Sequence, residues 1–151
     1  MHFCDYNREP FFVYGYSKIL KFEKMLRELL LDKGLKNEDM KQFLKEKSHK
    51  NEIFRGRYEK YDKLPIKSTE PFQCFYLLEL LSLLSQKTII KIDQRINELR
   101  NYVMHNKNII LHKNYNEANL IYDFQSFEKV FNLVMLFKEY FKKLENAQNN
   151  N

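Results

Sequence analysis

The chain has 151 residues, of which 44% are hydrophobic and 15% aromatic, and its formal net charge is +6. This length suits one domain with a substantial core, and the small number of glycines and prolines, 3 of each, argues against an all-β fold. The basic charge favours an anionic partner, and nucleic acid is the commonest partner of that kind.

Several other classes of protein are not expected. The two cysteines, Cys4 and Cys74, cannot form a disulfide framework and have no zinc-site spacing, so we expect reduced thiols, a cytoplasmic protein and a Cys74 buried in an apolar helix. Residues 1–10 lack the pattern of a signal peptide, and the apolar stretch 75–84 is too short to span a bilayer. Neither metal-ligand spacing nor a glycine-rich phosphate loop is present, so we expect no metal and no cofactor.

The first half of the chain predicts one long helix and a charged insertion. Apolar residues recur at helical spacing over Tyr16–Asp32, and Gly34 is a natural stop. Asn37 is a candidate N-cap for a short second helix. Residues 36–66 predict an exposed, partly helical, basic insertion, with Phe54, Tyr58 and Tyr61 placed among its cations.

The second half predicts three more helices. An apolar helix is expected over 71–86, capped by Ser68 or Thr69, and a second helix over 88–106. A final helix is expected over Asp123–Glu145, followed by a disordered polar tail at 147–151. The simplest fold is an all-α, antiparallel four-helix up-and-down bundle that forms one domain over residues 1–146.

The helix predicted over 88–106 has an apolar face and a polar face. At about 100° per residue, the apolar side chains form one stripe that should face the core: Ile89, Ile92, Ile96, Leu99 and Val103. Asn101 and His105 share the nearly opposite face, which also contains Glu98, and Arg100 lies at the edge of the stripe. We therefore expect His105 to point toward solvent or a partner.

The sequence Arg100-Asn101-x-x-x-His105 resembles the hallmark motif of the HEPN superfamily, in which an Arg precedes a His by a few residues in a small helical bundle. The resemblance covers the motif helix and the final helix. It implies a metal-independent endoribonuclease whose two copies of the motif meet in a homodimer, as in toxins, anti-phage effectors and RNA-targeting CRISPR effectors. It also implies an antitoxin or another defence protein as a possible partner.

The chemistry of these residue types supports the same activity. RNA carries its own nucleophile, the 2′-OH, beside each phosphate. His105 would transfer protons near neutral pH, Arg100 would stabilise charge on the phosphate, and Asn101 would position the substrate or the imidazole. One imidazole cannot easily act as base and acid in one step, so the second copy in a dimer is expected to supply the other.

Other residues extend the expected RNA surface or leave alternatives open. Arg55 and Arg57 are candidates for phosphate contacts and Tyr58 for base stacking, the alternative being a solvated charged face. Lys107 is a further candidate for RNA contact, and it stands where toxins paired with a nucleotidyltransferase antitoxin commonly have a Tyr. His112 either joins the site or lies in a loop. The rival function is a non-catalytic helical module that binds RNA or protein in a defence complex.

Overall fold

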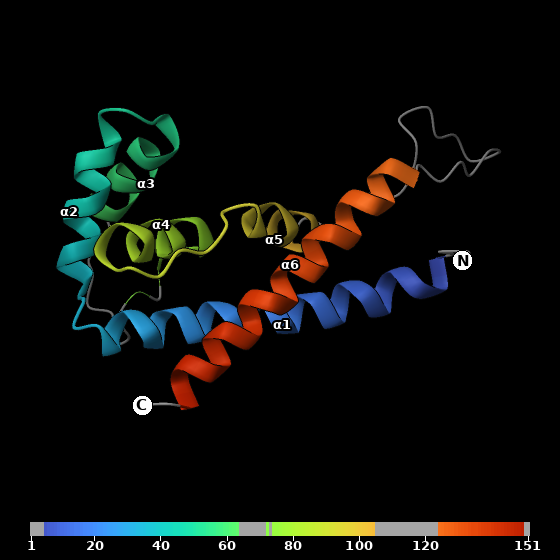
Figure 1. Cartoon of the computed structure of the whole chain (residues 1–151). Helices are drawn as coiled ribbons and strands as arrows, with labels where there is room; N and C mark the ends of the chain where they lie inside the picture. The colour runs from blue at the N-terminus through green and yellow to red at the C-terminus, as the bar shows by residue number, and fades with distance from the viewer. Residues whose placement is uncertain (1–4, 64–71, 73, 105–123, 150–151) are drawn as a thin grey trace. The chain divides into compact units, whose positions relative to one another are not determined.

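A computed structural model of the chain describes residues 5–63, 72, 74–104 and 124–149, without the side chains of 5–12 and 124–127 (Figure 1). These residues form six α-helices and no strand, so the all-α prediction is confirmed. The helices are α1 (Asp5–Asp32), α2 (Asn37–Ser48), α3 (Glu52–Lys63), α4 (Leu77–Lys87), α5 (Ile96–Met104) and α6 (Phe124–Asn149). The helix predicted last extends past Glu145, into part of the expected polar tail.

The chain divides into two compact units. We call Glu23–Ile92 the central unit, and Met1–Phe22 together with Asp93–Asn151 the terminal unit. α1 belongs to both, because its residues up to Phe22 pack in the terminal unit and the rest pack in the central unit. The terminal unit contains α5 and α6, and with them the described part of the motif.

α1 ends as predicted, at a glycine. Gly34 has φ +75°, and its N–H donates to the carbonyl of Leu31 at 2.8 Å. The next N–H, of Leu35, donates to the carbonyl of Leu30 at 3.0 Å. This pair of bonds is the Schellman motif, which ends a helix at a residue of positive φ. Glycine adopts that φ at little steric cost because it has no Cβ.

The segment predicted as an exposed insertion is two packed helices of the central unit. α2 and α3 contact each other, and α2 also contacts α4 (Figure 1). Tyr61 is buried, with its ring centroid 4.9 Å from that of Phe75, and the ring of Phe54 meets that of Phe43 at 5.7 Å. The expectation that Tyr61 is exposed among the cations was therefore wrong, since the aromatic side chains of α3 supply apolar area to a core.

The cap predicted for α2 was also wrong. Asn37 is the first residue of α2, and its side-chain oxygen accepts the N–H of Phe72 at 2.8 Å. The carboxylate of Asp39 instead accepts the N–H of Lys36 at 2.8 Å, which satisfies a donor at the helix start. Asn37 thus connects the start of α2 to the segment that precedes α4.

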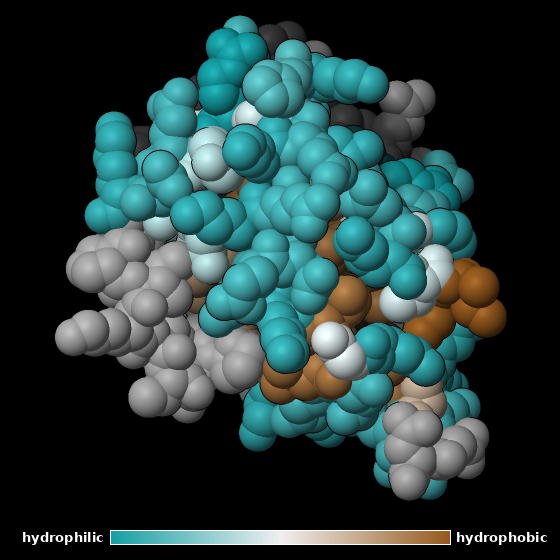
Figure 2. Space-filling view, turned by 90° about the vertical axis from the view of Figure 1, so that its left-hand side faces the viewer, coloured by the Kyte–Doolittle hydropathy of each residue, from teal (hydrophilic) through white to brown (hydrophobic). Residues whose placement is uncertain are grey.

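Charged side chains cover the outside of these helices, and the face drawn in Figure 2 is mostly hydrophilic with small hydrophobic patches. Two carboxylates of the central unit, Glu23 and Glu79, are nevertheless buried at 4% and 2% exposure. The Nε of Arg57 lies 2.8 Å from Oε1 of Glu79, and its guanidinium carbon lies 4.4 Å from the centroid of the Tyr76 ring. This ion pair joins α3 to α4.

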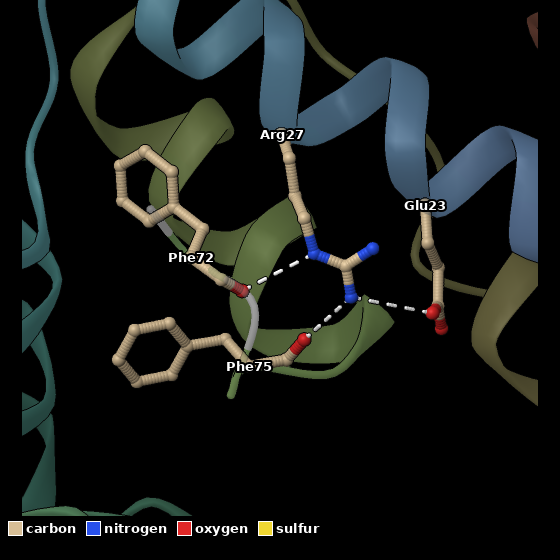
Figure 3. Close-up of polar contacts among 4 residues, drawn as sticks. All are labelled: Glu23, Arg27, Phe72 and Phe75. Atoms are coloured by element: carbon tan, nitrogen blue, oxygen red, sulfur yellow. Dashed lines mark hydrogen bonds and ion pairs between the residues drawn. The ribbon is translucent and has the colours of Figure 1, made fainter. Parts of the chain in front are cut away.

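Arg27 of α1 meets the second buried carboxylate and the turn before α4 (Figure 3). Its Nε donates to the carbonyl of Phe72 at 3.2 Å, and its Nη2 donates to the carbonyl of Phe75 at 3.1 Å and to Glu23 at 3.5 Å. Phe72 is fully buried and has φ +60°, a conformation that costs a bulky residue about 1–2 kcal/mol. By donating to both carbonyls, the guanidinium offsets part of this cost and stabilises the turn.

The turn explains why α4 begins later than predicted. Its N-cap is Tyr76, so 72 and 74–76 lie outside the helix, and the expected caps, Ser68 and Thr69, lie outside the described residues. Cys74 is in the turn and is exposed as a free thiol, so its predicted burial in a helix was wrong. The rest of α4 is apolar on most sides, as expected, with Leu77, Leu80, Leu81, Leu83 and Leu84 all fully buried.

The Arg57–Glu79 pair generates a stability prediction. Replacing Arg57 by Leu leaves the Glu79 carboxylate buried without that guanidinium, so the free energy of unfolding in urea should fall by about 2–3 kcal/mol. This loss of unfolding free energy is smaller than for a fully buried ion pair, because 38% of the Arg57 side chain is exposed and water screens its charge. Arg55→Leu, two residues away on an exposed side chain, should cost less than about 1 kcal/mol.

The double variant Arg57→Leu/Glu79→Leu should regain most of the lost stability, because it removes the buried carboxylate together with the cation of the ion pair. Equal losses for Arg57→Leu and Arg55→Leu, measured by far-UV circular dichroism, would contradict the structural role of the pair.

Candidate functional site

The helix that bears the motif begins at an acidic turn. Asp93 accepts the N–H of Arg95 at 2.9 Å on Oδ1, and its Oδ2 lies 2.6 Å from Nη2 of Arg95. The carbonyl of Asp93 then accepts the N–H of Ile96 at 3.2 Å, the first residue of α5. These bonds occupy the donors that a helix start leaves open.

The predicted start of this helix, near Thr88, was wrong. The hydroxyl of Thr88 donates to the carbonyl of Leu84 at 2.7 Å and accepts the N–H of Ile90 at 3.1 Å, which closes the end of α4. Residues 88–93 therefore form a connection rather than a first helical turn. Ile89, expected in the core stripe, is 96% exposed because it lies in this connection.

The rest of the predicted apolar stripe is confirmed. Ile92, Ile96, Leu99 and Val103 are all buried, the last three on α5. α5 packs against α6, whose buried residues include Val130, Leu133, Phe137 and Phe141. Burial of each such side chain contributes on the order of 1.5–3 kcal/mol, which holds the orientation of α5 in the terminal unit.

Arg100 and Asn101 lie beside this stripe, and both are partly buried. Nη1 of Arg100 donates to the side-chain oxygen of Asn101 at 3.5 Å, the long end of a hydrogen bond. The structure thus brings together a cation and an amide that are adjacent in the sequence. His105 follows Met104, the last residue of α5, and lies outside the described residues, as do Lys107 and His112.

A second cation lies near the motif and was not predicted. Nζ of Lys129 on α6 is 3.0 Å from the carboxylate of Glu98 and 6.0 Å from the centroid of the Tyr102 ring. Hydrogen bonding to Glu98, and then to Tyr102, raises the pKa of Lys129 above its ordinary value. The helical spacing of the sequence placed Glu98 on the outer face of this helix. It could not predict the contact with Lys129, which follows 31 positions later on another helix.

A hollow of about 540 Å³ opens next to this pair, lined by polar residues of the α5 region and of α6 together with two leucines. Arg95, Glu98, Glu128, Lys129 and Asn132 contribute its polar side chains, whereas Arg100 and Asn101 do not line it. The lining contains two cations, Arg95 and Lys129, and two carboxylates, Glu98 and Glu128, so its formal charges cancel. The hollow and the motif pair are separate features of the same unit.

The residues predicted to contact RNA through the insertion are all on α3, in the central unit. Arg57 is the ion-pair partner of Glu79, and Arg55 is exposed, with Nε 3.4 Å from the carbonyl of Ser48. Tyr58 is partly exposed. The nearby Lys41 of α2 is 2.9 Å from Asp62, whose carboxylate raises the pKa of that lysine. Two of the cations of this segment, Lys41 and Arg57, are therefore matched by carboxylates of the same unit.

Neither a metal site nor a membrane span is present in the described part of the chain. Its His, Cys, Asp and Glu side chains form no group of three or more that could hold a metal ion. None of its helices combines the length and the apolar character needed to cross a bilayer.

Comparison with family models, with curated proteins and with solved structures finds no match to this chain. The likeness to the HEPN superfamily therefore depends on the motif residues and their helix.

The acidic turn generates a prediction about pH. Hydrogen bonds from Arg95 hold the pKa of Asp93 below its ordinary value of 3.8. A carboxylate with a lowered pKa in the folded state stabilises that state at every pH above its unfolded value, and the contribution is lost as the pH falls through the folded value. An NMR titration of the side-chain carboxyl should give a midpoint below 3.8, and Arg95→Ala should raise it toward the ordinary value.

Lys91→Ala is the matched control, because it removes another exposed cation, two residues before Asp93, that makes no bond to its carboxylate. If Arg95→Ala and Lys91→Ala change the titration midpoint of Asp93 equally, the hydrogen bonds from Arg95 are not the cause of its lowered pKa.

Proposed function

We propose that the chain is a metal-independent endoribonuclease of the HEPN type, with Arg100, Asn101 and His105 at its active site. The observation that supports the proposal is the placement of Arg100 and Asn101 side by side on α5, with the buried stripe of that helix holding them in place. His105 follows directly after the last residue of α5 in the sequence.

The reaction needs only a base, an acid and a cation. An imidazole takes the proton of the 2′-OH, and the resulting oxyanion attacks the adjacent phosphorus. A new bond forms between the 2′-oxygen and phosphorus, and the bond to the 5′-oxygen breaks as an imidazolium donates a proton to that oxygen. The products are a 2′,3′-cyclic phosphate and a 5′-OH. The planar guanidinium of Arg100 would stabilise the charge that develops on the phosphate oxygens.

The proposal includes a homodimer. A single His105 would have to act as base and acid in the same step, whereas a two-fold axis through the site supplies a second imidazole and a second guanidinium. It also includes an antiparallel four-helix arrangement of the long helices, a cytoplasmic location, and a role as a toxin or anti-phage effector, controlled by an antitoxin or another defence protein. RNA contacts by Arg55, Arg57, Tyr58 and Lys107 belong to the same proposal.

A cleavage assay in EDTA tests the chemistry. Wild type should convert labelled single-stranded RNA to products with 2′,3′-cyclic phosphate ends. His105→Ala should slow the reaction by about 10²–10⁴-fold. Arg100→Ala should slow it by about 10²–10³-fold, because a preorganised charge is lost. His49→Ala is a matched control, since it removes an exposed imidazole in the central unit.

Cleavage by His105→Ala at the wild-type rate would overturn the proposal. RNA binding by wild type and variants alike, with no cleavage by either, would instead establish the rival function, a non-catalytic RNA-binding module.

The dimer has its own test. Specific activity should rise with protein concentration through the range in which light scattering shows the mass changing from one chain to two. A chain that remains monomeric at concentrations where it cleaves RNA would contradict the composite site.

A further inference from the structure

A cavity of about 330 Å³ lies within the terminal unit, lined by α1, α5 and α6. Its floor is apolar and includes Ile19, Leu99, Val103, Phe137 and Phe141, all of them buried. This volume is at the small end of the range for ligand pockets, about 300–1,000 Å³. The motif residues Arg100 and Asn101 do not line it, although Leu99 and Val103 lie on the same helix.

The lining of the cavity also includes three lysines. Lys18 of α1 is partly buried, and Lys138 and Lys142 of α6 are exposed. Nζ of Lys18 lies 5.5 Å from the ring centroid of Tyr14 and 5.2 Å from that of Phe141, both of which line the cavity. A lysine can place its apolar stem along such a floor and keep its ammonium group at the edge, where it is available to an anion.

One carboxylate, that of Glu145, also lines the cavity. It lies 3.4 Å from Nζ of Lys21, so it already has a cationic partner outside the lining. The net charge offered to a ligand is therefore positive, and it lies at the edge of a hydrophobic surface. This combination is complementary to a molecule with an apolar body and an anionic end.

Close contact between α1 and α5 prevents these two helices from moving together to close the cavity. A Cβ placed on Gly15 of α1 would meet Cγ2 of Val103 on α5 at 3.2 Å, so these helices already touch. α1 and α5 therefore cannot approach further at this point, so the apolar lining stays accessible. A ligand that covers this apolar surface removes it from water, which favours binding.

We propose that this cavity binds a free, monomeric amphipathic carboxylate, with its alkyl chain on the apolar floor and its carboxylate among Lys18, Lys138 and Lys142. The floor favours an alkyl chain over a nucleobase, because its side chains offer neither donors nor acceptors for base edges. The proposal is independent of the ribonuclease activity, since Arg100 and Asn101 do not line the cavity.

Isothermal titration with decanoate tests the proposal. We expect saturable binding at one site per chain and a rise in the melting temperature, because the ligand binds the folded state. From octanoate to decanoate the affinity should rise by roughly fourfold per added CH₂, and it should stop rising when the chain no longer fits. Acetate, which lacks the chain, and decyltrimethylammonium, which has the opposite charge, should not bind saturably.

Neighbouring lysines of α6 provide matched variants. Lys142→Glu reverses a charge at the cavity and should weaken decanoate binding by about fivefold or more. Lys143→Glu makes the same change at the next residue, which is exposed and does not line the cavity, and should stay within about twofold of wild type. Val134→Phe should fill the cavity and weaken binding by about tenfold or more, with circular dichroism checking the fold.

The proposal is overturned by equal effects of Lys142→Glu and Lys143→Glu, by absence of saturable decanoate binding, or by equal affinity for the cationic amphiphile. Binding to phosphatidylglycerol vesicles without binding of monomeric decanoate would also overturn it, in favour of a membrane surface. None of these outcomes changes the expectation for RNA cleavage in EDTA.

Discussion

The central unit depends on the burial of two carboxylates, because a carboxylate removed from water must meet a cation or destabilise the fold. Glu79 meets Arg57 at 2.8 Å and Glu23 meets Arg27 at 3.5 Å. The guanidiniums of Arg57 and Arg27 each link two separate segments of this unit. Arg57 joins α3 to α4, and Arg27 binds the carbonyls of Phe72 and Phe75 and so defines the turn that precedes α4. Two charges thus organise a unit whose other buried residues are mostly apolar.

This use of Arg57 changes how the positive charge of the chain should be understood. A cluster of cations in the sequence favours an anionic partner, yet Arg57 is paired with a buried carboxylate and Lys41 with Asp62. Tyr61, expected to lie among cations at the surface, packs against Phe75. Only a three-dimensional arrangement shows which charges are matched within the chain. The positive charge available to a partner is better judged from particular surfaces, such as the three lysines that line the cavity of the terminal unit, than from composition.

Features set by local chemistry were predictable from the sequence. The stop at Gly34 follows from one glycine, and the existence of α6, though not its end, from apolar spacing sustained over many turns. The buried face of α5 follows from the positions of Ile96, Leu99 and Val103. Features set by distant residues were not. The start of α4 depends on Arg27, and Lys129 reaches Glu98 from another helix. The start of α5 was missed for a different reason, because it depends on a local turn in which Asp93 binds residues two and three positions later. The hydrogen bond from Arg100 to Asn101 was not predicted, because adjacent residues of a helix do not face each other.

The bonds of Arg27 have a consequence for the order in which the central unit assembles. They join residues 45 and 48 positions apart, whereas α2 and α3 are neighbours along the chain. Closing the longer loop costs more chain entropy, so the α2–α3 hairpin can collapse first and the turn at Phe72 must wait for α1. The turn at Phe72, and with it the first residues of α4, should therefore become ordered only as α1 docks, after the helical signal of α2 and α3 has appeared.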